Sequence, residues 1–235
     1  MRVGIIGAGN MGSAFARRLS AAGHDVFITS RTFDEAKRVA ETLPKTVKAI
    51  EQPQLAERVD VLIAATPYGE QVDALRGAGN LAGKTVIDIS NPLTADMSGL
   101  VVGHTTSAAE EIAKSLDRAK VVKAFNTIFA QVLGDGHSAG ARVQAFYAGD
   151  DENAKRTVRS LIDSMRFEPV DAGPLRNARL LEPLGMLNIY LGYMAKLGTD
   201  IAPAIQKVSS LSAREARSES SDVQRSSEPE RDARG

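Results

Sequence analysis

The stretch Arg2-Val-Gly-Ile-Ile-Gly-Ala-Gly-Asn-Met-Gly12 contains a short apolar strand that runs directly into a glycine-rich turn. From Ala14 to Ala22 apolar side chains recur at helical spacing, so the turn connects a strand to a helix. In that setting Gly-x-Gly-x-x-Gly is the fingerprint of a dinucleotide-binding unit, whose helix N-terminus holds the phosphates. We expect Gly7 to allow the turn, Gly9 to leave room for a pyrophosphate, and Gly12 to let the helix lie close to the strand. An ordinary strand–turn–helix with incidental glycines is the alternative.

The composition is that of an ordinary globular protein with one large domain, or with one domain and a small appendage. Of 235 residues, 43% are hydrophobic and 25% are charged, and 29 basic residues balance 29 acidic ones. This balance favours neither nucleic acid nor a membrane as partner. The absence of cysteine excludes disulfides and thiolate chemistry, and no cluster of histidines or carboxylates has metal-ligand spacing. Arg2 and Gly7 interrupt any long apolar run, so we expect no signal peptide and a cytoplasmic protein.

Strand and helix patterns alternate along most of the chain, which predicts an α/β, doubly wound, mostly parallel Rossmann sheet. The loops at 66–68, 90–93 and 125–128 each follow the carboxyl end of a predicted strand. Ligands of such sheets bind at that edge, so we expect these loops to meet the glycine turn and to surround a nicotinamide ring. The predicted strands are 3–6, 26–29, 46–50, 60–65, 83–89, 120–125, 143–148 and 168–171.

The residues at the end of the second predicted strand indicate the cofactor. An acidic residue there would bind the ribose hydroxyls of NAD, whereas an arginine with small hydroxyl residues suits the 2′-phosphate of NADP. This chain reads Thr29-Ser30-Arg31-Thr32, and its first carboxylate after this point is Asp34. A guanidinium and two hydroxyls are the donors that a phosphate requires, so we predict NADP(H). A surface arginine in a polar turn is the alternative.

The C-terminal part of the chain changes in character. We expect an NADP-binding Rossmann domain over 1–172, an apolar helical region over 173–210 and a disordered tail over 211–235. The stretch Arg176 to Val208 is rich in Leu, Met, Ile, Tyr and Ala and must be covered, so it is a candidate lid or homodimer interface. Its polar residues and Pro183 make it a poor membrane span. The tail carries serines and charges of both signs without an aromatic residue.

Several motifs occur together in this chain: Gly7 to Gly12, Ser30-Arg31, Ser107-Ala-Ala-Glu110, Lys123-Ala-Phe-Asn-Thr-Ile128, and Asp171 through Glu182 with Asn177 and Arg179. In this combination the chain resembles the NADP-dependent oxidoreductases of the coenzyme F420 (8-hydroxy-5-deazaflavin) reductase family. It is also similar to the NADPH-binding domain of metalloreductases that pass electrons through a flavin to iron. The resemblance covers nearly all of residues 1–208.

The resemblance implies that NADPH lies along the first helix and that hydride moves between its nicotinamide and a second, stacked ring. No residue need then act as nucleophile or as general acid, because the protein supplies position and polarity. By position, Gly7, Gly9, Asn10, Met11 and Gly12 match the pyrophosphate turn, and Ser30 and Arg31, beside Thr32, match the 2′-phosphate site. Thr66 and Pro67 match the wall beside the nicotinamide ribose, and Asn91, Pro92, Ala124, Asn126 and Ile128 match the floor where the rings meet.

The identity of the small-molecule acceptor stays open. Deazaflavin reductases often have histidine at the position of Asn126, whereas Phe-Asn-Thr resembles the flavin-linked branch. A redox sensor that binds NADP(H) without turnover is a second hypothesis. A carbonyl or imine reductase is a third, and it would need a proton donor, for which Tyr68 and His104 are the candidates.

Other polar residues are interpreted as structural. We expect His24 to be a surface residue, favour a structural role for His104 and see no partner for His137. Tyr190 and Tyr193 are predicted to be packing groups with a polar end. Asn177 and Glu182 are expected to orient neighbouring loops.

Overall fold

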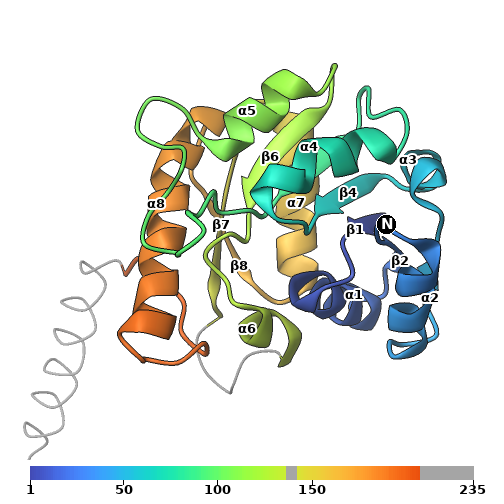
Figure 1. Cartoon of the computed structure of the whole chain (residues 1–235), viewed down its shortest axis with the longest axis horizontal. Coiled ribbons are helices and arrows are strands. Elements are labelled where there is room, and N and C mark those ends of the chain that lie inside the picture. Colours follow the sequence, from blue (N-terminus) through green and yellow to red (C-terminus); the bar gives the residue numbers. More distant parts are fainter. Residues whose placement is uncertain (136–141, 207–235) are drawn as a thin grey trace, which may run out of the picture. The chain divides into compact units, whose positions relative to one another are not determined.

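The computed structural model describes residues 1–135 and 142–206. In these residues eight strands form one sheet in the order β3-β2-β1-β4-β5-β6-β7-β8 (Figure 1). β6 and β7 are its one antiparallel pair, so β7 and β8, which are parallel to each other, run opposite to the other six strands. The prediction of a doubly wound, mostly parallel Rossmann sheet is confirmed. The strands are β1 (Arg2–Ile6), β2 (Asp25–Thr29), β3 (Val47–Ala49), β4 (Val61–Ala64), β5 (Thr85–Asp88), β6 (Lys120–Ala124), β7 (Gln144–Gly149) and β8 (Glu168–Asp171).

The central strands are short apolar runs because helices cover both of their faces. Every residue of β4 and β5 is buried. The register pairs Ile6 with both Thr29 and Ala64, and it pairs Ala64 with Asp88. The carboxyl ends of β1, β2, β4 and β5 therefore stop at one level of the sheet, and the loops that follow them lie along one edge.

In the described residues the two largest hydrophobic cores lie on the two faces of the sheet, and a third, smaller cluster contains Phe146, Ala148 and Leu181. One core contains buried side chains of α1 (Asn10–Ala21), α6 (Ala130–Asp135) and α7 (Glu152–Ser164), including Phe15 and Leu161. The other core contains side chains of α3 (Leu55–Arg58), α4 (Tyr68–Gly77) and α5 (Ala108–Ser115). The remaining helices are α2 (Phe33–Glu41), α8 (Ala178–Ile189), the 3-10 turns Gln52–Gln54 and Leu175–Asn177, and the π-turn Tyr190–Met194.

The C-terminal helix is shorter than the sequence suggested. A helical region was expected to extend towards Val208, but α8 ends at Ile189 and the π-turn ends at Met194. Lys196 and Gly198 have positive φ angles of 59° and 88°, which an α-helix cannot contain.

α8 belongs to the compact unit Met1–Pro203. Within the described residues no helix is long and apolar enough to cross a membrane. The predicted disordered tail lies outside the described residues.

A buried charge cluster fixes α8 to the sheet. The ammonium of Lys123 on β6 lies 2.8 Å from Asp88 of β5 and 2.9 Å from Glu182 of α8, and all three side chains are fully buried. Lys123 also donates to the Ser90 carbonyl at 2.5 Å. Glu182 accepts hydrogen bonds from the backbone N–H groups of Ala108 and Ala109 at the start of α5. Burial raises the pKa of Glu182, and the Lys123 ammonium opposes this shift.

Replacing Lys123 with methionine should destabilise the protein by about 3–5 kcal/mol, because two buried carboxylates lose their counter-charge. The loss should shrink below neutral pH, since the raised pKa of Glu182 would rise further and protonation would remove part of the buried charge. Urea unfolding at two pH values measures this. Lys120→Met, which removes a one-third-exposed partner of Asp151, is the control and should cost less than about 1 kcal/mol. Equal losses in the two variants would contradict the assignment.

Candidate functional site

The glycine turn between β1 and α1 has the geometry that a bound dinucleotide requires. Gly7 has a φ of 110°, and a Cβ at this position would lie 2.5 Å from the Ala65 carbonyl oxygen. A Cβ on Gly12 would lie 1.9 Å from the Gly7 carbonyl oxygen, so only glycine lets α1 approach the strand this closely. A Cβ on Gly9 would have no atom within 4 Å. Gly7 therefore allows the turn, Gly12 allows the close packing of α1, and Gly9 leaves open space.

The first turn of α1 presents backbone donors to this open space. Gly9 is the N-cap residue, and no side chain caps the helix. The first N–H groups of a helix have no partner within it and carry the positive end of the helix dipole. No acidic residue occupies the first turn. The turn at Gly9, Asn10 and Met11 is thus fitted to a diphosphate.

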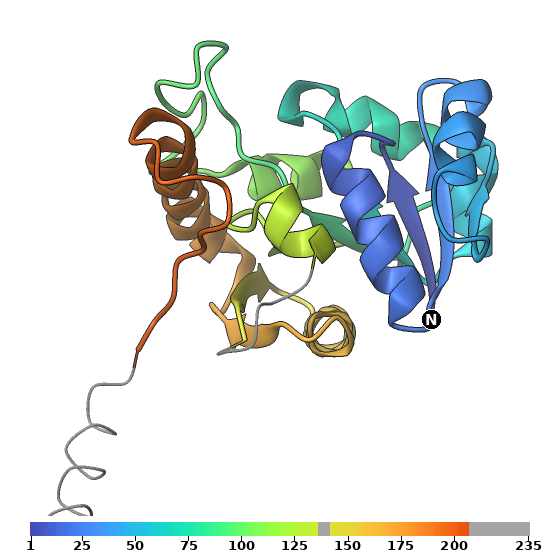
Figure 2. The ribbon, with the colours of Figure 1, turned by 90° about the horizontal axis from the view of Figure 1, so that it is seen from below.

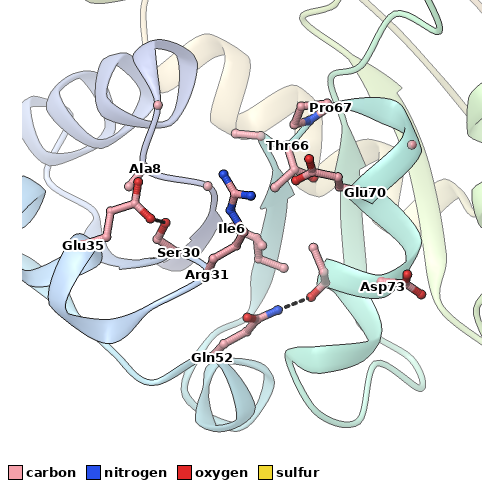
Figure 3. Close-up of a pocket in the computed structure, with 15 residues that line it drawn as sticks. Ile6, Ala8, Ser30, Arg31, Glu35, Gln52, Thr66, Pro67, Glu70 and Asp73 are labelled. Atoms are coloured by element: carbon pink, nitrogen blue, oxygen red, sulfur yellow. Dashed lines mark hydrogen bonds between the residues drawn. The ribbon is translucent and has the colours of Figure 1, made fainter.

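A first pocket of about 580 Å³ lies on one side of this turn (Figure 3). Its walls include Ser30 and Arg31 after β2 and Thr66 and Pro67 after β4, all of which were predicted as cofactor residues. Arg31 is exposed and extends into the pocket from the end of β2 (Figure 3). Thr32 does not line the pocket; its side chain caps α2 instead. The structure therefore brings Ser30 and Arg31, the residues predicted for the 2′-phosphate, into one pocket with Thr66 and Pro67.

Sequence reasoning missed Glu35 in this pocket. Its carboxylate turns back from α2 and accepts a hydrogen bond from the Ser30 hydroxyl (Figure 3). The Glu35 backbone N–H donates to the Thr32 hydroxyl at 3.3 Å. Thr32 and Glu35 have the spacing of a capping box, in which the acidic side chain reaches back past the N-cap. That spacing was the available signal.

A second pocket of about 310 Å³ lies beyond the other side of the turn. Its lining includes Asn91, Asn126 and Ile128, which were predicted for the ring-stacking floor, and Met11, which was predicted for the pyrophosphate turn. Pro92 and Ala124 are buried and line neither pocket. The predicted loops thus divide between two pockets, and the missed lining residues include Leu93, Met97, Phe129, Asn188 and Tyr193. The residues from α8 and from the turn after it reach this pocket because the loop after β5 lies beside α8 (Figures 1 and 2).

α8 holds the floor of the second pocket. The amides of Asn91 and Asn126 interlock: Asn91 donates to the Asn126 carbonyl at 2.8 Å, and Asn126 donates to the Asn91 side chain at 2.9 Å. Asn126 also donates to the Leu181 carbonyl of α8 at 2.7 Å. A Cβ on Gly185 would lie 2.4 Å from the Asn91 side-chain oxygen. The asparagine pair is therefore held directly against α8.

Phe125 fixes the floor from below. It adopts a φ of 61°, in the left-handed region that costs a bulky residue free energy. Its buried ring makes edge-to-face contacts with Phe15 of α1 and with Phe167. This packing holds the strained backbone and turns the next residue, Asn126, towards the pocket.

The two proton donors that the sequence suggested lie outside both pockets. Tyr68 donates a hydrogen bond to Glu111, and burial together with this carboxylate raises its pKa. His104 is exposed. The candidate that lines the second pocket is Tyr193, whose ring contacts Phe129 edge to face with centroids 5.5 Å apart.

The remaining residues that the sequence set aside have structural contacts where they are described. His24 contacts the N-terminal amine at 3.2 Å and Ser164 at 2.8 Å. Asn177 donates to the Ala172 carbonyl at 2.5 Å, as expected of a residue that orients its loop. His137 lies outside the described residues. Among the described residues no group of three potential metal ligands occurs.

The chain is similar to known NADP-dependent oxidoreductases. The family described as "NADP oxidoreductase coenzyme F420-dependent" matches residues 2–92. The F420-dependent NADP reductase of Methanothermobacter marburgensis is 30% identical over 209 residues, covering 81% of this chain and 92% of that protein. A solved structure from Arthrobacter sp. FB24, assigned as an F420-dependent NADP reductase, has a TM-score of 0.79 at 30% identity. It covers 87% of this chain and 99% of that one.

A second group of relatives is much longer than this chain. Metalloreductase STEAP3 of Rattus norvegicus is 35% identical over 189 residues, which are 79% of this chain. The chain spans only 37% of the length of that metalloreductase. The fold and the relatives place the chain among the NADP-dependent oxidoreductases of the Rossmann type. The chain belongs to the F420-dependent NADP reductase family.

Gly9→Ala and Gly12→Ala should separate binding from folding. The Gly9→Ala methyl enters open space, so the thermal midpoint should stay unchanged while NADPH binds about tenfold more weakly, because the methyl occupies the expected phosphate position. Gly12→Ala should lower the free energy of unfolding by about 1–3 kcal/mol, because its methyl collides with backbone. Thermal unfolding and NADPH fluorescence measure the two effects. Undiminished NADPH binding by Gly9→Ala would argue against a phosphate at this turn.

Proposed function

We propose that the chain transfers hydride between NADP(H) and a deazaflavin of the coenzyme F420 type, with a flavin as the alternative acceptor. The diphosphate of NADP(H) would lie on the first turn of α1, and its 2′-phosphate would bind Arg31, with Ser30 beside it, in the first pocket. The nicotinamide would reach the second pocket past Met11, with Thr66 and Pro67 beside its ribose. The cofactor supplies the hydride; the residues around it bind, orient and exclude water.

The observation that carries the proposal is the chemistry of the second pocket. Among the described residues that line it, none carries a carboxylate, ammonium, guanidinium or imidazole group, and Tyr193 is the one phenol. Transfer of hydride between two stacked rings needs close, oriented contact and no general acid from the protein. The apolar side chains of Met11 and Ile128 and the planar ring of Phe129 suit such a ring. The relatives that match over almost their whole length are F420-dependent NADP reductases, which favours deazaflavin over flavin.

Self-association is proposed as well. α8 and the π-turn leave large apolar side chains exposed, and a second copy of the chain would cover them. These side chains are Leu180, Leu187, Tyr190, Tyr193 and Met194. Light scattering that finds a monomer at micromolar concentration would contradict a homodimer.

Replacing Arg31 with alanine should weaken NADPH binding by about 2 kcal/mol, or about 30-fold, because one charge-assisted contact to the 2′-phosphate is lost. NADH binding should be nearly unchanged. Titration of the nucleotide fluorescence measures both constants. Arg38→Ala is the matched control, since Arg38 lies near the end of α2 and does not line the pocket. Equal losses for NADPH and NADH would contradict the 2′-phosphate assignment.

The acceptor is tested by stopped-flow mixing of the protein with NADPH and, in turn, F420, FMN, and a panel of ketones and imines. We expect the 340 nm absorbance to fall fastest with F420. Tyr193→Phe keeps the ring contact with Phe129 and removes the phenol, so it should leave the rate within about twofold. Loss of a carbonyl or imine reaction in this variant would instead indicate a reductase that uses Tyr193 as acid. No oxidation with any acceptor would favour a redox sensor.

A further inference from the structure

The first pocket contains more negative than positive side chains. Among its described lining residues Arg31 is the one cation, whereas Glu35, Glu70 and Asp73 are anions. A pocket that binds only a phosphorylated adenosine would be expected to have the opposite balance. Glu35 is the anion that touches a residue of the 2′-phosphate site, because its carboxylate accepts the Ser30 hydroxyl (Figure 3).

The Ser30 hydroxyl has a single proton to donate. While Glu35 accepts it, Ser30 offers a 2′-phosphate no donor, only oxygen lone pairs. A dianionic phosphate must therefore take this proton away from Glu35 and also lie beside its negative charge. An unphosphorylated 2′-hydroxyl is favoured there instead, because it can donate a hydrogen bond to the Glu35 carboxylate or to the Ser30 oxygen.

We propose that Glu35 sets the cofactor preference of this chain by favouring the ribose hydroxyl over the 2′-phosphate. Arg31 attracts NADPH, and Glu35 opposes it, so the pocket also accepts NADH. The role rests on the proposed function, because it assumes that adenosine binds in the first pocket. Glu35 acts on binding and takes no part in hydride transfer.

The charge of Glu35 is tested by Glu35→Gln, which keeps the shape and a hydrogen-bond acceptor for Ser30. NADPH should bind about fivefold more tightly, the scale of one unit charge removed at contact distance in water. NADH should bind equally or more weakly, so the ratio of the two dissociation constants shifts towards NADPH. Asp34→Asn is the matched control: it removes the same charge from the same first turn of α2, but Asp34 does not line the pocket.

An unchanged ratio of the NADPH and NADH dissociation constants in Glu35→Gln, or an equal shift in Asp34→Asn, would overturn the role of Glu35. If the unmodified protein still binds NADPH, that result leaves the proposed function standing. If the unmodified protein binds neither nucleotide, the proposed function fails and the role of Glu35 fails with it. Nucleotide fluorescence or calorimetry gives both constants without any acceptor.

The shared proton is tested by a double-mutant cycle between Ser30 and Glu35. With Glu35 present, Ser30→Ala should change the NADPH dissociation constant less than about twofold, because the hydroxyl is already committed. In a Glu35→Ala background the hydroxyl is free to reach the phosphate, and Ser30→Ala should weaken NADPH binding about fivefold or more. Equal effects of Ser30→Ala in both backgrounds would overturn the shared-proton argument.

Discussion

The geometry of the site depends on the buried ion pairs of the Lys123 ammonium. This ammonium joins two strands and α8 at one point, through Asp88, Glu182 and the Ser90 carbonyl. The cluster holds two carboxylates and one ammonium, and the N-terminus of α5 offsets the excess negative charge through two hydrogen bonds to Glu182. Charges this deeply buried are costly unless every partner is in place, so the cluster tolerates one arrangement of α8. α8 in turn holds the asparagine pair of the second pocket.

Most of the fold could be predicted because its signals are local. The glycine turn and the continuous apolar runs of the parallel strands each lie within a few residues of the chain. The sequence therefore indicated the sheet and its strand boundaries to within two or three residues, and it placed Ser30, Arg31, Thr66, Asn91 and Asn126 at the carboxyl edge. Here local preference and tertiary structure agree.

The missed features arise from contacts between distant segments. Nothing near Lys123 in the chain shows that its partners are Asp88 and Glu182, on other elements. The end of α8 was misplaced because its apolar composition continues past the residues whose positive φ angles end the helix. Glu35 was missed for a different reason: a carboxylate that binds the ribose is expected directly at the end of β2, whereas this one returns to that strand end from the first turn of α2. Tyr193 was set aside because its position depends on the irregular turn after α8.

That irregular turn changes which face of the C-terminal segment meets the second pocket. Residues five apart on a regular α-helix point about 140° away from each other, so Asn188 and Tyr193 would face different directions. Between Tyr190 and Ala195 the backbone instead closes a wider ring, with the Ala195 N–H bonded to the Tyr190 carbonyl at 2.9 Å. The extra residue rotates the helical phase and brings both side chains to one wall. A one-residue insertion or deletion here would thus exchange the polar rim of the pocket for another set of side chains while the sheet stayed intact.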